Sequence, residues 1–216
     1  MKVIIAGSTG MIGQLVLQRC LGSEMVEEVV SIVRMPTAIS HRKLSEVVVE
    51  NLEDYADQGH LFKNVDAAFF CIGVYTGQVP DAEFKRITVD YAVAFAQKLK
   101  HESPEATFCL LSGAGADRTE RSRTSFARYK GMAENQISKL KLKFHSFRPA
   151  YIYPDAPRKE PNIGYTILKV FYPLLKLFGK KYSIRSVELA EAMFNVAMNG
   201  ADREILENED ILRYTK

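Results

Sequence analysis

The stretch Val3-Ile4-Ile5-Ala6-Gly7-Ser8-Thr9-Gly10-Met11-Ile12-Gly13 decides the fold of this chain. An apolar run ends at Gly7, the glycines follow in a GxxGxxG spacing, and a stretch with helical periodicity begins at Met11. A glycine-rich turn between a buried strand and a helix is typical of dinucleotide-binding folds. We expect Gly7 to permit the sharp exit from the strand, Gly10 to let the backbone approach a pyrophosphate, and Gly13 to let the helix pack closely.

The helix that follows this turn offers its free N–H groups and the positive end of its dipole to phosphates. Ser8 and Thr9 add hydroxyl groups beside it. A tight turn that binds nothing is the alternative interpretation. We therefore predict cofactor contacts from every residue of the turn, namely Gly7, Ser8, Thr9, Gly10, Met11, Ile12 and Gly13.

Strands and helices alternate along the chain. Short apolar runs rich in β-branched or aromatic residues predict buried strands, at Val3 to Gly7, Val29 to Arg34, Glu46 to Asn51, Val65 to Gly73, Thr107 to Gly113 and Lys143 to Pro149. Helical spacing between them is clearest in Met11 to Leu21, Ala82 to Lys100 and Ser125 to Leu140. The alternation predicts an α/β Rossmann fold, a doubly wound and mostly parallel sheet with helices on both faces and ligand binding at its carboxyl edge.

The length and composition fit one compact domain. At 216 residues, with 47% hydrophobic and 25% charged residues, the chain has room for a single domain over residues 1–216 and none for a separate substrate domain. After Pro149 the pattern loosens, and a short helix is predicted from Val187 to Met198. We expect residues 151–216 to form a small C-terminal cap on the substrate side.

The apolar segment from Ile163 to Phe178 is interrupted by Lys169, Pro173 and Lys176, so it is too short and too broken to span a bilayer. A helix that covers the cleft is the prediction, and an amphipathic surface anchor is the alternative. The chain starts with Met1-Lys2 and enters an apolar run at once, without the leader that secretion requires, which predicts a cytoplasmic protein.

The remaining composition argues against several classes of partner. Cys20, Cys71 and Cys109 lie among apolar neighbours and are expected to be buried, reduced thiols. The four histidines and the absence of CxxC or HExxH motifs predict no metal site. A net charge of +3 without a recognition motif predicts no nucleic-acid partner.

The residue that reads the adenosine ribose is expected at the end of the second strand, about 20 residues beyond the glycines. Arg34 occupies that position. A guanidinium complements a 2′-phosphate through charge-assisted hydrogen bonds, so NADP(H) is predicted in preference to NAD(H). His41, Arg42 and Lys43 are expected either to reinforce this positive field or to be solvated loop charges.

Two further strand ends are predicted to reach the cofactor because ligands bind at the carboxyl edge of such sheets. Asn51 and Leu52 follow the third strand and are expected to border the adenine pocket. Cys71, Ile72 and Gly73 follow the fourth strand and are expected to close over the ribose.

Taken in order, these landmarks resemble the short-chain dehydrogenase/reductase superfamily, specifically its small atypical branch of NAD(P)-binding proteins with GxxGxxG turns. The resemblance spans nearly the whole chain. It is carried by the glycine turn, Arg34, Leu110-Leu111-Ser112-Gly113, Lys130-Gly131-Met132-Ala133-Glu134 and Arg148-Pro149-Ala150. It implies that Pro149, Ala150 and Tyr151 contact the cofactor after the sixth strand.

Catalytic members of that superfamily use a serine from the fifth strand and a Tyr-x-x-x-Lys helix. The resemblance implies that Ser112 polarises a substrate carbonyl and that Lys130 binds the nicotinamide ribose and lowers the pKa of the tyrosine. Phe126 occupies the tyrosine position. Because Phe126 has no ionisable proton, the resemblance leaves the proton donor unassigned.

Other hydroxyl groups are candidates for that role. Tyr129 directly precedes Lys130, so on a helix it points roughly 100° away and is not a simple substitute. Tyr151, Tyr153 or a water held by Ser112 are the candidates, and packing of the two tyrosines against the tail is the alternative.

Two functions follow from these residues. The first is an NADP(H)-dependent oxidoreductase that moves hydride to or from a small carbonyl or quinone. The second is a non-catalytic NADP(H)-binding redox sensor, which Phe126 would not impair. The basic run Arg118-Thr119-Glu120-Arg121-Ser122-Arg123, with Arg128 and Lys130, predicts a cationic rim and an anionic substrate, or else solvated charges. The apolar stripe of Ala82 to Lys100 or Ser125 to Leu140 is a candidate homodimer face, and packing within the monomer explains it equally.

Overall fold

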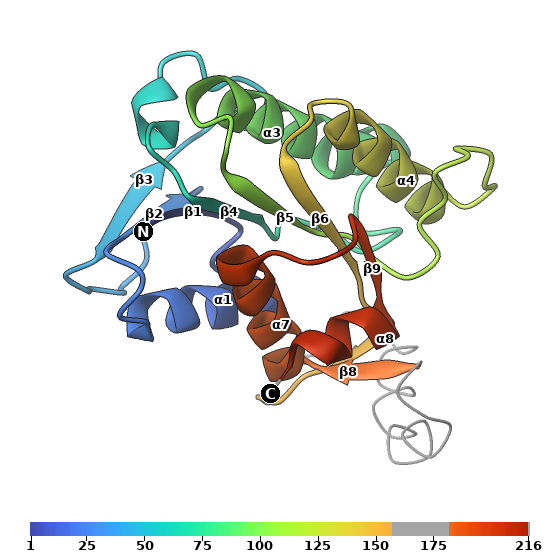
Figure 1. Cartoon of the computed structure of the whole chain (residues 1–216). Coiled ribbons are helices and arrows are strands. Elements are labelled where there is room, and N and C mark those ends of the chain that lie inside the picture. Colours follow the sequence, from blue (N-terminus) through green and yellow to red (C-terminus); the bar gives the residue numbers. More distant parts are fainter. Residues whose placement is uncertain (157–181, 216) are drawn as a thin grey trace.

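The computed structural model describes residues 1–156 and 182–215 (Figure 1). Among these residues, seven strands form one sheet in the order β3-β2-β1-β4-β5-β6-β9, and every neighbouring pair is parallel. The predicted doubly wound α/β fold is therefore confirmed. The strands are β1 Lys2–Ala6, β2 Glu28–Val33, β3 Leu44–Val48, β4 Ala67–Phe70, β5 Thr107–Leu111, β6 Lys143–Arg148 and β9 Ile205–Glu207.

Helices cover both faces of the sheet, as Figure 1 shows. Helices α1 (Met11–Gly22) and α7 (Ser186–Asn199) pack side by side on one face, and α3 (Tyr91–Glu102) and α4 (Ser125–Ser138) cover the other. The apolar stripes of α3 and α4 are buried in the core of their own chain. The shorter elements are η1 Gly59–Phe62, α2 Asp81–Lys85, η2 Arg86–Asp90, α8 Asn208–Ile211 and η3 Leu212–Tyr214.

The central strands β1, β4 and β5 are mostly apolar because each face of the sheet is covered. In β1, Val3 and Ile5 pack towards α1 and α7, whereas Ile4 and Ala6 pack towards α3 and α4. This alternation follows from the two-residue period of a strand. The apolar runs therefore predict the two-sided burial correctly.

Several strands end earlier in the structure than the sequence predicts. The run 65–73 contains only four residues of strand, because the chain leaves the sheet after Phe70. The helix predicted over 82–100 is α2 and α3 joined through the π-helical turn η2. Apolar character continues past the carboxyl ends of strands, because the next residues line a cavity described below.

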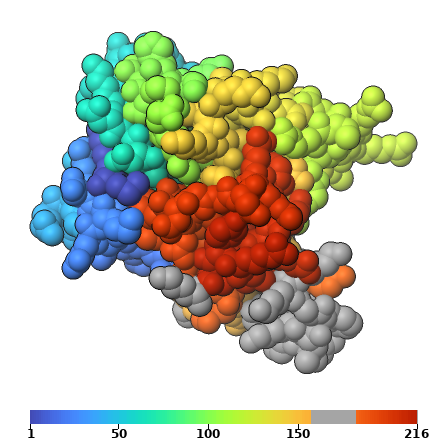
Figure 2. Space-filling view, in the orientation of Figure 1, coloured from blue at the N-terminus to red at the C-terminus, as the bar shows by residue number. Residues whose placement is uncertain are grey.

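The C-terminal region contains elements too short to be recognised from the sequence. β7 (Tyr151–Tyr153) and β8 (Ser183–Arg185) form a separate two-stranded parallel sheet, and β9 extends the main sheet beside β6. Figure 2 shows the C-terminal residues, in red, packed across the middle of one face. The predicted helix 187–198 is α7, and the segment 163–178 lies outside the described residues. Within the described residues, no helix is long and apolar enough to cross a membrane.

The loop before β3 determines where Lys43 lies relative to Arg34. Lys43 lies beside the start of β2, where its carbonyl accepts the Val29 N–H at 2.8 Å, and its Nζ donates to the Ser23 carbonyl at 2.6 Å. Because β3 is parallel to β2, the chain must return to the amino edge before Leu44, whereas Arg34 lies at the carboxyl edge. Lys43 therefore does not reinforce the field at Arg34, since it binds the Ser23 carbonyl near the start of β2.

Candidate dinucleotide and substrate site

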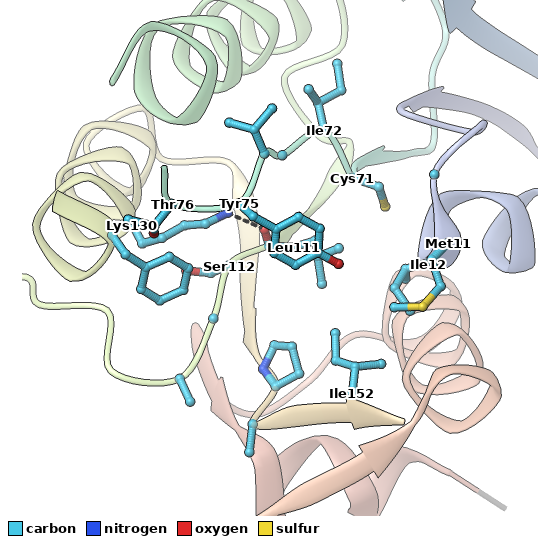
Figure 3. Close-up of a pocket in the computed structure, with 18 of the residues that line it drawn as sticks. Met11, Ile12, Cys71, Ile72, Tyr75, Thr76, Leu111, Ser112, Lys130 and Ile152 are labelled. Atoms are coloured by element: carbon cyan, nitrogen blue, oxygen red, sulfur yellow. Dashed lines mark hydrogen bonds between the residues drawn. The ribbon is translucent and has the colours of Figure 1, made fainter. Parts of the chain in front are cut away.

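A cavity of about 750 Å³ opens at the carboxyl edge of the sheet, beyond the ends of β4, β5 and β6 and beside the first turn (Figure 3). This is where the winding of the sheet reverses, since β2 and β4 flank β1, and such a reversal is the general ligand position in these folds. The structure brings together at this cavity many of the predicted site residues, which are Gly10, Met11, Ile12, Cys71, Ile72, Gly73, Ser112, Lys130, Pro149, Ala150 and Tyr151.

Two glycines of the first turn are required by the packing of the protein itself. Gly7 has a φ of +88°, and a Cβ there would lie 2.7 Å from the Cys71 carbonyl carbon. A Cβ on Gly13 would lie 2.1 Å from the Gly7 carbonyl oxygen. These contacts match the roles expected for Gly7 in the sharp exit from β1 and for Gly13 in the close approach of α1.

Gly10 and Gly73 are different, because nothing within the described protein demands glycine at either position. Gly10 has ordinary extended dihedrals, and its Cβ would meet only the Gly7 carbonyl oxygen at 3.4 Å. A Cβ on Gly73 would have no neighbour within 4 Å. Both glycines line the cavity. Their missing side chains leave room that a closely approaching ligand fits, which is the expectation for a dinucleotide held against this turn.

The N-terminus of α1 also lacks a side-chain cap. Its N-cap is Gly10, which supplies no side-chain hydrogen bond to the first turn of the helix. The Ser8 hydroxyl, which we expected to face phosphates, instead bonds the buried Ser31 hydroxyl of β2 at 2.6 Å. Ser8 thus ties the turn to β2, while Thr9 is exposed. Main-chain N–H groups, and not the Ser8 side chain, are the donors that this turn presents.

The residues predicted for the adenosine half lie outside the cavity. Arg34 is exposed directly after β2. The Asn51 side chain accepts the Glu53 N–H at 3.0 Å, and Leu52 is buried in the core. Because β3 ends at Val48, the chain has already turned into the core by residue 52, and the place of Leu52 beside the adenine stays a prediction.

Ser112 belongs to a buried polar network below the cavity. Its hydroxyl donates to Glu134 Oε1 at 2.7 Å, and the same oxygen accepts the Ser146 hydroxyl at 2.8 Å and Arg148 Nε at 3.0 Å. Glu134 is completely buried, and its carboxylate raises the pKa of Arg148. Since the Ser112 proton is donated to Glu134, Ser112 presents lone pairs to the cavity, which differs from the implied role of donating to a substrate carbonyl.

Lys130 lies beside Ser112 and points into the same cavity (Figure 3). Its Nζ donates to the Leu111 carbonyl at 2.9 Å. Burial lowers the pKa of Lys130 to about 8, and the nearby Glu134 and Cys71 act in the opposite direction. Burial raises the pKa of the Cys71 thiol to about 12, so this cavity-lining cysteine is a neutral thiol at neutral pH.

Phe126 also lines the cavity, one helical turn before Lys130. Its ring packs against Gly113, where a Cβ would lie 2.5 Å from the Phe126 Cζ. The glycine after Ser112 therefore accommodates the ring. The position that the superfamily uses for a phenol holds a hydrocarbon here.

The tyrosines divide into those inside the cavity and those outside it. The Tyr129 hydroxyl donates to Asp81 Oδ2 at 2.6 Å, and its ring contacts Phe84, so it points away as its helix position predicts. Tyr153 is not among the described lining residues, whereas Tyr151 is. Tyr75 lines the cavity as well (Figure 3).

The sequence interpretation missed Tyr75 and Glu134. Tyr75 lies in the segment Val74, Tyr75 and Thr76 that continues from Gly73 at the same sheet edge, so extending the topological argument by three residues would have included it. Glu134 is four residues after Lys130, on the same face of α4. Because Lys130 was expected near Ser112, this four-residue spacing could have predicted that Glu134 lies near Ser112 as well.

The predicted cationic rim is only partly present. Arg118 forms an ion pair with Glu204 at 2.7 Å, and the Arg128 guanidinium lies over the Tyr129 ring at 4.9 Å. Neither residue is among the described lining of the cavity. These two arginines therefore do not contribute to the cavity lining: Arg118 is bound by Glu204, which is distant in sequence, and Arg128 by its neighbours Tyr129 and Ser122. Arg121 and Arg123 are exposed.

The parallel sheet, the glycine turn and the cavity at the winding reversal define a dinucleotide-binding Rossmann protein of the short-chain dehydrogenase/reductase type. The model of the NAD(P)H-binding family matches residues 7–197. The chain belongs to this family, which confirms the resemblance seen in its sequence. A search of curated protein sequences finds no match.

Solved structures share the fold at low identity. WbmH of Bordetella bronchiseptica, in complex with NAD+, superposes with a TM-score of 0.71 and 19% identity, covering 95% of this chain and 74% of that one. Gre2 of Candida albicans, in complex with NADPH, gives 0.71 and 13%, covering 96% and 77%. UDP-glucose 4-epimerase of Thermotoga maritima, with UDP-glucose, gives 0.69 and 15%, covering 96% and 76%. The similar structures thus include complexes with NAD and with NADPH.

Proposed function

We propose that this chain is an NADP(H)-dependent oxidoreductase whose substrate is a small, largely apolar carbonyl compound or quinone. The observation that carries the proposal is the cavity itself. Its lining includes Lys130 and Ser112 as well as two glycines, Gly10 and Gly73, whose missing side chains leave space for a ligand. A dinucleotide fits this arrangement, and when bound it supplies the hydride for the reaction.

The chain's own residues then bind, orient and shield the reactants. The main chain at the start of α1 is expected to hold the pyrophosphate, and Lys130 to bind the nicotinamide ribose. Ser112 accepts a hydrogen bond, since its own proton is donated to Glu134. Apolar side chains such as Ile72 and Ile152 reduce the access of water.

The cavity lining supports the substrate class. Among the described lining residues, Lys130 is the only charged side chain, and most of the others are apolar. An apolar site with few polar groups suits a small organic molecule. Since Arg118 and Arg128 bind elsewhere, support for an anionic substrate is reduced to Lys130.

The preference for NADP(H) is supported by Arg34. It directly follows β2, next to the strand that carries the glycine turn, and its side chain is exposed. A guanidinium at this sheet edge complements a 2′-phosphate, whereas NAD-specific sites favour a carboxylate.

One observation favours a second function, a non-catalytic NADP(H)-binding redox sensor. Phe126 fills the usual place of the phenol and packs on Gly113, so the cavity keeps its shape without its usual acid. Binding without turnover is what this arrangement would give if no other group provides the proton.

The test is to measure NADPH and NADH binding by calorimetry and then to follow the reduced-nicotinamide absorbance with a panel of aldehydes, ketones and quinones. We expect tighter binding of NADPH and turnover of at least one apolar carbonyl or quinone. Gly73→Val should block binding, whereas Gly22→Ala, also in open space but outside the cavity, should not. Tight binding with no turnover across the panel would refute the enzyme and favour the sensor.

A further inference from the structure

Reduction of a carbonyl requires a proton for the product oxygen, and the usual donors are not available in this cavity. Position 126 is phenylalanine. The Tyr129 hydroxyl is bound by Asp81 outside the cavity, and the Ser112 proton is donated to Glu134. Apart from a water held by Ser112, the proton must come from another side chain of the cavity lining.

Lys130 has the geometry for this role. An ammonium group carries three N–H donors, and among the described residues Lys130 Nζ has one acceptor, the Leu111 carbonyl at 2.9 Å. The remaining donors lie at the cavity, beside Ser112 and one helical turn from Phe126 (Figure 3). The side chain thus reaches the region that a phenol at position 126 would otherwise serve.

We propose that Lys130 is the proton donor of the reaction, an inference that rests on the proposed oxidoreductase function. As the carbonyl carbon takes up hydride, the π electron pair of the carbonyl remains on its oxygen. That oxygen then forms an O–H bond while one Nζ–H bond of Lys130 breaks. Lys130 is left as a neutral amine and regains its proton from solvent.

The surroundings of Lys130 make its ammonium a stronger acid than a free lysine. Burial lowers its pKa from 10.5 to about 8, while Glu134 on the same helix and Cys71 from the end of β4 act to raise it. Tyr75 and Tyr151 are the other titratable side chains that line the cavity. An acid whose pKa lies near the working pH is effective in general catalysis. Because the donor acts in its protonated form, turnover must fall as the pH rises above about 8.

The first experiment measures kcat against pH for the unmodified protein with a carbonyl that it reduces. We expect a plateau below about pH 8 and a tenfold decrease per pH unit above it. In parallel, NMR of the protein with labelled lysine follows the titration of Lys130 directly, both free and with NADPH. A titration midpoint near 10.5, the ordinary value, would contradict the proposal.

The second experiment compares Lys130→Arg with Lys139→Arg, a matched exchange at the exposed end of α4. Arginine keeps the positive charge and the N–H groups but does not release a proton in proteins. We expect kcat to fall at least 100-fold in Lys130→Arg, with the Kd for NADPH changed less than about threefold, and no effect of Lys139→Arg. In Tyr75→Phe and Tyr151→Phe, whatever the value of kcat, its decrease above about pH 8 should persist, because Lys130 is its source.

The outcomes separate this inference from the function on which it rests. If Lys130→Arg retains kcat, or if either tyrosine variant loses it 100-fold and with it the pH dependence, Lys130 is not the donor although the protein is an oxidoreductase. If the unmodified protein binds NADPH and reduces nothing in the panel, the proposed function is refuted and this role of Lys130 with it.

Discussion

The substitution Gly10→Val tests whether glycine is required at this position for folding or for ligand binding. The backbone at Gly10 is extended, with φ −79° and ψ 166°, which valine adopts readily. Its Cβ would meet only the Gly7 carbonyl oxygen at 3.4 Å. We therefore expect the free energy of unfolding without ligand to fall by no more than about 1 kcal/mol, the cost of a poorer N-cap residue.

NADPH binding should respond very differently, because the valine side chain would fill the space beside the start of α1. A 100-fold increase in Kd corresponds to about 2.7 kcal/mol. At a concentration of 100 times its Kd, NADPH stabilises the unmodified protein by about 2.7 kcal/mol. For a domain of this size that raises the Tm by roughly 5–10 °C. Gly10→Val should lose most of this increase.

Gly13→Ala is the matched control, in which we expect the loss of stability to occur without ligand. Its Cβ would lie 2.1 Å from the Gly7 carbonyl oxygen, so the backbone must move. Overpacking of this kind costs about 1–3 kcal/mol, which should lower the Tm even without ligand. The assay is thermal unfolding of the three proteins with and without NADPH, with calorimetry for the Kd. If Gly10→Val keeps both its Tm and its affinity for NADPH, no dinucleotide approaches Gly10.

Three further predictions concern charge. Glu134→Gln removes the buried partner of Arg148 and should lower the free energy of unfolding by about 3–5 kcal/mol in urea titrations; a loss below about 1 kcal/mol would contradict the role given to this pair. Arg34→Asp should raise the calorimetric Kd for NADPH at least tenfold and leave that for NADH within about twofold, and equal weakening of both would refute Arg34 as the phosphate reader. Burial lowers the pKa of His145, so the unfolded chain binds the proton more readily, and stability that is full above pH 6.5 should decrease as the pH falls below it. Urea midpoints at pH 7 and pH 5 measure this, and an equal decrease in His145→Asn would show that His145 is not its source.

The parts of the site that the sequence predicted are those whose geometry is local. Gly7 and Gly13 lie in one turn, so their spacing alone implies the close contacts that the structure shows. The direction of Tyr129 follows from the helical repeat and is correct, since its hydroxyl bonds Asp81 away from the cavity. Such arguments need a strand, a turn or one helix face, and no tertiary contact.

The missed parts depend on residues distant in sequence. Arg118 pairs with Glu204, and no local pattern shows that this pairing removes it from the cavity rim. The sequence left open whether Lys43 lies near Arg34, because its position depends on how β3 pairs with β2. The three-residue strand β9 has no periodicity to detect, and only its pairing with β6 defines it. In each case the deciding contact is tertiary.

The same tertiary contacts make the cavity depend on the C-terminal end of the chain. Asn208 of α8 accepts the Ala150 N–H at 2.9 Å and donates to the Ser183 carbonyl at 3.0 Å, so it joins the cavity wall to β8. The neighbouring Glu207 bonds Arg148, which also binds Glu134 and through it Ser112. Strand β9 therefore does more than extend the main sheet. Because it brings Glu207 and Asn208 to these positions, the polar network beneath Ser112 and the turn after β6 are held by residues far beyond α4 in the sequence.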